Sequence, residues 1–222
     1  GQCNCENTRH GKLVSIFLSK ASSTWWMSDG QLKHYQGLFP FLKNSKNRVL
    51  SSCFSKEKLS YINSLKTDQK NNKFLILNSP SWIKGADDAV AYAKENNLEY
   101  ELVWGLKHKD LLAKLAESRG IIFFPKAYDT CPRMTIEARL LDCELILNDN
   151  VQHKNEDWFT NKKTTLEYLK ENSQAFWNEI EKTATKNLNL PIEANSTPAS
   201  HCFKIIIPFY NCEKWIHKCL QS

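Results

Sequence analysis

Residues 121–147 read IIFFPKAYDTCPRMTIEARLLDCELIL, and this stretch determines the fold class. It begins with the apolar run 121–124 and closes with the apolar run 144–147. Short apolar runs bounded by polar or turn residues are typical of strands that are covered on both faces of a sheet. Between them, helical spacing predicts a helix over 134–141, with apolar positions at Ile136, Leu140 and Leu141. The stretch therefore predicts two parallel strands joined by a crossover helix.

The same alternation extends upstream. Apolar runs at 74–78 (FLILN) and 100–104 (YELVW) predict two more strands, and helical spacing predicts helices over 86–96 and 109–118. Strands that alternate with helices of this length form right-handed crossover units around a parallel sheet. We therefore predict an α/β fold with a doubly wound, Rossmann-like parallel sheet.

Two shorter segments, 24–27 and 48–51, predict a partial strand–helix–strand unit near the N-terminus. Ser28 and Gln31 have the spacing of a capping box, which predicts a helix through about residue 35. Residues 56–72 carry most of the polar run KTDQKNNK and predict a helix followed by an interdomain hinge.

The C-terminal part begins with a long amphipathic helix, predicted over 163–186 with apolar positions at Leu166, Leu169, Phe176, Trp177 and Ile180. Residues 189–202 are rich in Pro, Ser and Asn, which is typical of a linker. The apolar run 203–207 (FKIII) then predicts a new strand.

The composition narrows the function classes. Of the 222 residues 41% are hydrophobic, and 30 Lys and Arg against 24 Asp and Glu give a net charge of +6. This apolar content excludes a mainly disordered chain. The cations are scattered rather than gathered in a stripe, so we expect no nucleic-acid partner. No run of 18 apolar residues occurs and no hydrophobic segment follows the N-terminus, so we expect no transmembrane segment, no signal peptide and a cytoplasmic location.

The eight cysteines are spread along the chain without a C-x-x-C pair, which favours reduced, unligated thiols. Cys3, Cys5 and His10 are the one group that resembles a zinc site, but their spacing differs from the usual zinc motifs. We therefore expect no metal.

Two loops that follow predicted strands carry candidate site residues, because ligands of parallel α/β sheets bind where the strands end and the helices begin. In the first loop, Lys84 and Gly85 stand immediately before a predicted helix. A Lys at a helix N-terminus, followed by a Gly that lets the backbone approach a ligand, suits a phosphate group. The alternative interpretation is a solvent-exposed Lys in a turn.

The second loop, after 121–124, carries Asp129, and the helix that follows it carries Glu137. The two carboxylates can face the same crevice and accept charge-assisted hydrogen bonds from sugar hydroxyls. Backbone N–H groups of residues 131–134 would meet a phosphate at the positive end of the helix. The alternative is an ordinary helix-dipole partner at Asp129 and a solvated helix residue at Glu137.

With these motifs the chain resembles a family 4 glycosyltransferase of the GT-B type over about residues 20–190. The spacing of Asp129 and Glu137 matches the family's pattern of two acids separated by seven residues, and Lys84-Gly85 matches its KG pair. The resemblance implies that Lys84 clamps the diphosphate of a nucleotide-sugar donor, that Glu137 holds the ribose and that Asp129 contacts the transferred sugar. Lys84 and Asp129 would be catalytic, and the implied donor-binding set is Lys84, Asp129, Thr130, Cys131, Arg133 and Glu137.

The resemblance implies sugar transfer with retention, without a cofactor, to an unknown acceptor. Ser79 stands where the family has an Arg, and Pro132 removes one amide donor; Arg133 or Lys126 are the candidates to replace the missing cation. These departures leave two alternatives open, a non-catalytic nucleotide-binding module and a nucleotide-sugar epimerase or phosphorylase of the same fold.

The resemblance also implies a domain organisation. Residues 1–55 would be the tail of an acceptor domain, 73–188 the donor domain, and 203–222 the truncated start of a second glycosyltransferase, similar to family 2 of the GT-A type. In that second domain Tyr210 and Glu213 would lie near the nucleotide. We expect the 222-residue chain to be inactive in transfer by itself, because catalysis in such enzymes needs both domains.

Overall fold

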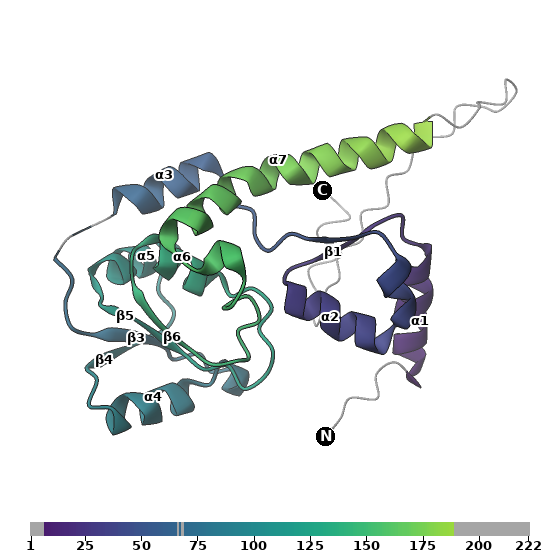
Figure 1. Ribbon diagram of the computed structural model, residues 1–222. Coiled ribbons are helices and arrows are strands. Elements are labelled where there is room, and N and C mark those ends of the chain that lie inside the picture. Colours follow the sequence, from purple (N-terminus) through teal and green to yellow (C-terminus); the bar gives the residue numbers. More distant parts are fainter. Residues whose placement is uncertain (1–6, 66, 68, 189–222) are drawn as a thin grey trace, which may run out of the picture. The chain divides into compact units, whose positions relative to one another are not determined.

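The computed structural model describes residues 7–65, 67 and 69–188 (Figure 1). Of these, the residues up to Ala184 belong to one compact unit. The longer elements in chain order are α1 (Arg9–Lys20), β1 (Thr24–Trp26), α2 (Asp29–Leu38), β2 (Asn47–Val49), α3 (Lys56–Ser64), β3 (Phe74–Leu77), α4 (Ala86–Glu95), β4 (Tyr100–Val103), α5 (His108–Glu117), β5 (Gly120–Phe123), α6 (Arg133–Leu140), β6 (Glu144–Leu147) and α7 (Lys162–Leu188). Short 3₁₀ turns are η2 (Pro40–Asn44), η3 (Trp82–Lys84) and η4 (Asp157–Phe159).

The four central strands form one parallel sheet in the order β4-β3-β5-β6. All residues of β5 and the first three of β3 are buried, whereas the edge strands β4 and β6 are mostly half-buried or exposed. Burial of both central strands on both faces explains their continuous apolar runs. The predicted α/β class and the parallel sheet are confirmed.

Helices cover both faces of this sheet (Figure 1). Phe74, Ile76 and Ile122 pack with α4, where the small residues Ala89 and Ala93 are fully buried. The opposite face has a larger core that includes Leu75, Ile121 and Phe123 together with residues from α3, α5, α6 and α7. Each buried Leu, Ile or Phe stabilises the fold by roughly 1.5–3 kcal/mol, so both layers contribute to stability. This arrangement is compatible with a Rossmann-like fold.

The N-terminal elements form a smaller parallel pair, β1 and β2, joined by α2. Ser28 caps α2 by accepting a hydrogen bond from the Gln31 amide at 3.0 Å, and the Gln31 side chain accepts one from the Met27 amide at 2.8 Å. Trp26, Phe39 and Leu42 form the buried core here. The predicted strand–helix–strand unit and its cap are therefore confirmed.

The sequence pattern missed α1. Thr8 caps this helix, but its apolar residues do not all face one core. Val14 and Leu18 pack inward, whereas Leu13, Ile16 and Phe17 are 40–59% exposed. Leu13, Ile16 and Phe17 nevertheless recur at helical spacing, so the sequence carries a helix signal here that the prediction left out.

The predicted apolar face of α7 is confirmed at Leu166 and Leu169, which pack in the main core, but not at Trp177. Leu169 is fully buried, but Trp177 is 57% exposed, so its assignment to the buried face was wrong. The polar residues Asn172 and Glu179 are buried instead. Asn172 donates to the Ser52 carbonyl at 2.9 Å, and Glu179 pairs with Lys46 and Arg48, so polar partners from the N-terminal segment determine which face turns inward.

The chain turns into α4 through a backbone conformation that requires glycine. Gly85 has φ of +65°, and a Cβ atom there would lie 1.8 Å from the Phe124 carbonyl oxygen. The loop after β3 therefore passes directly against the end of β5. Positive φ and this close approach both exclude an L side chain.

We expect Gly85→Ala to lower the free energy of unfolding by about 2–4 kcal/mol, because positive φ and a backbone clash add together. Gly37→Ala is the matched control, since nothing lies within 4 Å of a Cβ atom at that helical position. The control should be neutral or stabilising by about 0.5–1 kcal/mol. Urea denaturation measures both, and equal stability of the two variants would contradict the close approach.

Candidate functional site

The strand order makes the chains that leave β3 and β5 run apart, toward opposite edges of the sheet. β3 connects through α4 to β4 on one side, whereas β5 connects through α6 to β6 on the other. The two loops therefore diverge from adjacent parallel strands. Ligands of open α/β sheets bind at such a point, where the strand order reverses.

The two diverging loops are fixed against each other and against the loop after β6. The Lys126 amide donates to the Ile83 carbonyl at 2.8 Å. Asn148 and Asn150 both donate side-chain N–H groups to the Pro125 carbonyl, at 3.0 and 2.7 Å. These bonds give the sheet edge a defined backbone before any ligand binds.

Asp129 is held by its backbone on both sides. Its amide donates to the Asn150 carbonyl at 2.8 Å, and its carbonyl accepts from the Gln152 amide at 3.0 Å. Its carboxylate Oδ2 lies 2.8 Å from the Lys84 Nζ. The Lys84 and Asp129 side chains are 36% and 18% exposed, so the ion pair lies at the boundary between core and solvent.

Glu137 lies in a different set of contacts. Its side chain is only 3% exposed, and its Oε1 accepts from Lys58 Nζ at 2.7 Å and meets His108 Nε2 at 2.9 Å. The structure thus brings Lys84 and Asp129 together and joins Glu137 to α3 and α5. Since a buried carboxylate needs a partner cation, the contact with Lys58 explains how Glu137 tolerates its position.

Sequence reasoning missed Lys58 and His108. His108 begins α5, directly after the loop that follows β4, so the strand-end rule that singled out the other two loops applies to it equally. Lys58 carries no such signal, because it lies in the segment interpreted as a helix and hinge. That helix exists as α3, and Leu59 and Ile62 anchor it in the main core.

The remaining candidate residues in the second loop differ in their burial and in their contacts. The Cys131 thiol is buried 3.5 Å from the Ser52 hydroxyl, and desolvation raises its pKa to about 12. It therefore stays a neutral thiol and only its backbone could meet a ligand. The exposed Arg133 guanidinium lies 5.3 Å from the centre of the Phe54 ring, whereas Lys126 is 3.4 Å from Asp88. Thr130 is half-buried.

The helix N-termini at this edge differ from those elsewhere. Thr8, Ser28 and Ser55 cap α1, α2 and α3 with side-chain hydrogen bonds, but α4, α5 and α6 have no side-chain cap. The first turns of α4 and α5 contain Asp residues, and the first turn of α6 contains no acid. The start of α6 is therefore suited to an anion.

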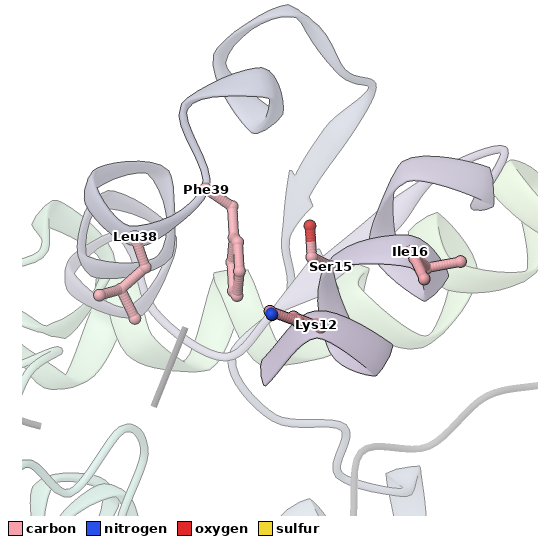
Figure 2. A pocket seen from close by; sticks show the side chains of 5 residues that line it. All are labelled: Lys12, Ser15, Ile16, Leu38 and Phe39. Atoms are coloured by element: carbon pink, nitrogen blue, oxygen red, sulfur yellow. The ribbon is translucent and has the colours of Figure 1, made fainter. Parts of the chain in front are cut away.

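An open hollow lies outside this site, between α1 and α2. Figure 2 shows its lining side chains, which are Lys12, Ser15, Ile16, Leu38 and Phe39. It contains one cation and no carboxylate or nucleophile pair, so it offers no catalytic arrangement.

Among the described residues, no group of three or more His, Cys, Asp and Glu is placed to hold a metal ion. The described cysteines 53, 131 and 143 are unpaired. Cys3, Cys5, Tyr210 and Glu213 lie outside the described residues, so the predictions for them stay predictions. No helix of the described chain is long and apolar enough to cross a membrane, and the expected cytoplasmic location stays a prediction.

Comparisons with protein-family models, with curated proteins and with solved structures give no match. The case for a function therefore depends on the site geometry and on the motifs.

His153 is a fully buried residue that contacts the first turn of α6. Its ring is fully buried, stacks on Trp158, packs edge-on against Phe159, and its Nε2 lies 3.2 Å from the Thr135 hydroxyl at the start of α6. Desolvation lowers the pKa of His153 from 6.5 to about 4. The imidazole is therefore neutral at physiological pH.

This pKa shift predicts acid sensitivity. The unfolded chain takes up the proton near pH 6.5 and the folded one only near pH 4, so stability is full above pH 6.5 and falls as the pH approaches 4. At about 1.4 kcal/mol per pH unit the loss approaches about 3 kcal/mol. His153→Phe should remove this component from urea unfolding curves measured between pH 7 and 4. Parallel pH profiles of both proteins would contradict it.

Proposed function

We propose that this protein binds a nucleoside-diphosphate sugar at the edge where β3 and β5 end, and that it is a glycosyltransferase of the GT-B type acting with retention. Residues 73–188 are the donor domain in this proposal. The observation that supports it best is the pair of Lys84 and Asp129, which meet at 2.8 Å from the two loops that diverge from adjacent strands. An anion-binding cation and a hydroxyl-binding carboxylate then stand side by side where phosphate and sugar join in such a donor.

The other residues take the roles that the family resemblance implies. Glu137 accepts hydrogen bonds from the ribose hydroxyls, because carboxylate oxygens accept strongly from hydroxyl groups. Backbone N–H groups at the start of α6 serve the diphosphate, close to Thr130 and Cys131. Arg133 is the favoured replacement for the cation absent at Ser79, because it is exposed and is the first residue of α6, at the proposed anion site.

A non-catalytic nucleotide-binding module is the second candidate. Pro132 occupies the N-cap of α6 and has no N–H group, so the anion site has one donor fewer. Binding of both free nucleotide and nucleotide sugar without any release of sugar would favour this candidate. The proposed glycosyltransferase also includes three parts that the resemblance implies: an acceptor domain upstream of the donor domain, an acceptor molecule, and a second glycosyltransferase domain after residue 202.

Calorimetric titration with UDP, GDP and ADP tests the proposal directly. One of the three should bind, and its monophosphate should bind more weakly because the diphosphate offers Lys84 more negative charge. Binding of none of them would reject the proposed function.

Lys84→Met should weaken binding of that nucleoside diphosphate about 10- to 100-fold, because a charge-assisted hydrogen bond contributes about 1.5–3 kcal/mol. Lys126→Met is the control, because this lysine belongs to the neighbouring loop and lies 3.4 Å from Asp88, away from the Asp129 carboxylate. The control should bind within about twofold of wild type. Equal loss in both variants would show a general charge effect instead of a site at Lys84.

Substitutions of Asp129 and Glu137 should affect the binding of free nucleotide and of nucleotide sugar differently. Glu137→Gln should weaken both the free nucleotide and the nucleotide sugar by about tenfold or more, because both contain ribose. Asp129→Asn should preserve or improve binding of the free nucleotide, since it releases Lys84, and should weaken the nucleotide sugar. Titration of both ligands against both variants measures this, and the same pattern in the two variants would contradict the division of roles.

A further inference from the structure

The Glu137 carboxylate is asymmetric in its contacts. Lys58 Nζ and His108 Nε2 both meet the same oxygen, Oε1, at 2.7 and 2.9 Å. The other oxygen, Oε2, has no hydrogen-bond partner among the described residues. The side chain is only 3% exposed, yet Oε2 is not among the fully buried side-chain atoms of the described residues that lack a partner, so this oxygen still reaches solvent and a ligand hydroxyl could donate to it.

The two partners differ in how firmly they are held. Lys58 lies in the first turn of α3, its amide donates to the Ser55 cap at 3.2 Å, and its Nζ lies 4.5 Å from the centre of the buried Phe54 ring. Its side chain is 20% exposed. The His108 side chain is 51% exposed, so it makes its contact from the solvent side. Lys58 is therefore the partner that fixes the carboxylate from within the protein.

We propose that Lys58 is the positioning residue for ribose recognition: it neutralises Glu137 and holds Oε1, so that Oε2 is presented to the ribose hydroxyls. This inference rests on the proposed function and adds a residue outside the motif-matched set. A charge that is paired and held in one rotamer before binding loses little freedom when the ligand arrives. Lys58 itself touches no ligand in this arrangement.

The experiment compares a ribonucleotide with an analogue that lacks both hydroxyls. The full chain is titrated by calorimetry with whichever of UDP, GDP and ADP binds, and with its 2′,3′-dideoxy form. Wild type should prefer the ribonucleotide by about tenfold or more, the equivalent of one charge-assisted hydrogen bond. Lys58→Met should reduce this preference to within about twofold.

Matched variants separate positioning from a merely structural ion pair. Lys58→Arg retains the charge and should keep most of the preference, and Lys56→Met, at an exposed position on the same helix, should leave it unchanged. Lys58→Gln serves if Lys58→Met does not fold, because a neutral amide leaves less unpaired charge while losing the ion pair. His108→Ala should keep the preference, since Lys58 still holds Oε1.

The outcomes decide whether Lys58 positions Glu137 for ribose or only stabilises the fold. A lower melting temperature with an unchanged preference in Lys58→Met or Lys58→Gln would overturn the positioning role. A preference lost only in His108→Ala would assign that role to the histidine and overturn it as well. Wild type that binds both nucleotides equally would overturn ribose recognition while nucleotide binding stands, whereas no binding at all would reject the proposed function itself.

Discussion

The reversal of strand order between β3 and β5 is the constraint on which the rest of this structure depends. These two strands pair in parallel at the centre of the sheet, yet their chains leave toward opposite edges and opposite faces. The loops that follow them start side by side, where they are bonded to each other, and then lead to different crossover helices. Lys84 and Asp129, 45 residues apart in the chain, meet because of this topology and not because of sequence proximity.

Sequence patterns predicted the fold of the central region because its strands and helices are one-sided or fully buried. The runs at 74–78 and 121–124 are short, bounded by polar or turn residues and therefore typical of buried strands, and Ala89 and Ala93 mark the face of α4 that approaches the sheet. The same logic failed at Trp177, an apolar side chain at a helical position of α7 that stays exposed. Periodicity detects a single buried face, and it gives no information where burial is shared with polar partners.

Part of the candidate site was predictable from the sequence. Strand ends and helix starts identified the loops of Lys84 and Asp129, because that rule follows from topology alone. It could not show that Glu137 pairs with Lys58, which precedes it by 79 residues and lies on a helix of no evident function. Such a pairing depends on the reach of individual side chains and on how a buried charge is compensated, and neither leaves a periodic trace in the sequence.

The ion pair between Lys84 and Asp129 has a consequence for selectivity. In the free protein the lysine is already neutralised, so a simple anion that approaches it must compete with a carboxylate that the backbone holds in place. A ligand that carries only a phosphate gains one contact and leaves Asp129 without its partner. A ligand that carries hydroxyl donors beside its phosphate satisfies both groups at once. In the proposed function the resting contact would act as a filter, which excludes abundant inorganic anions and admits molecules that present both kinds of group at the right separation.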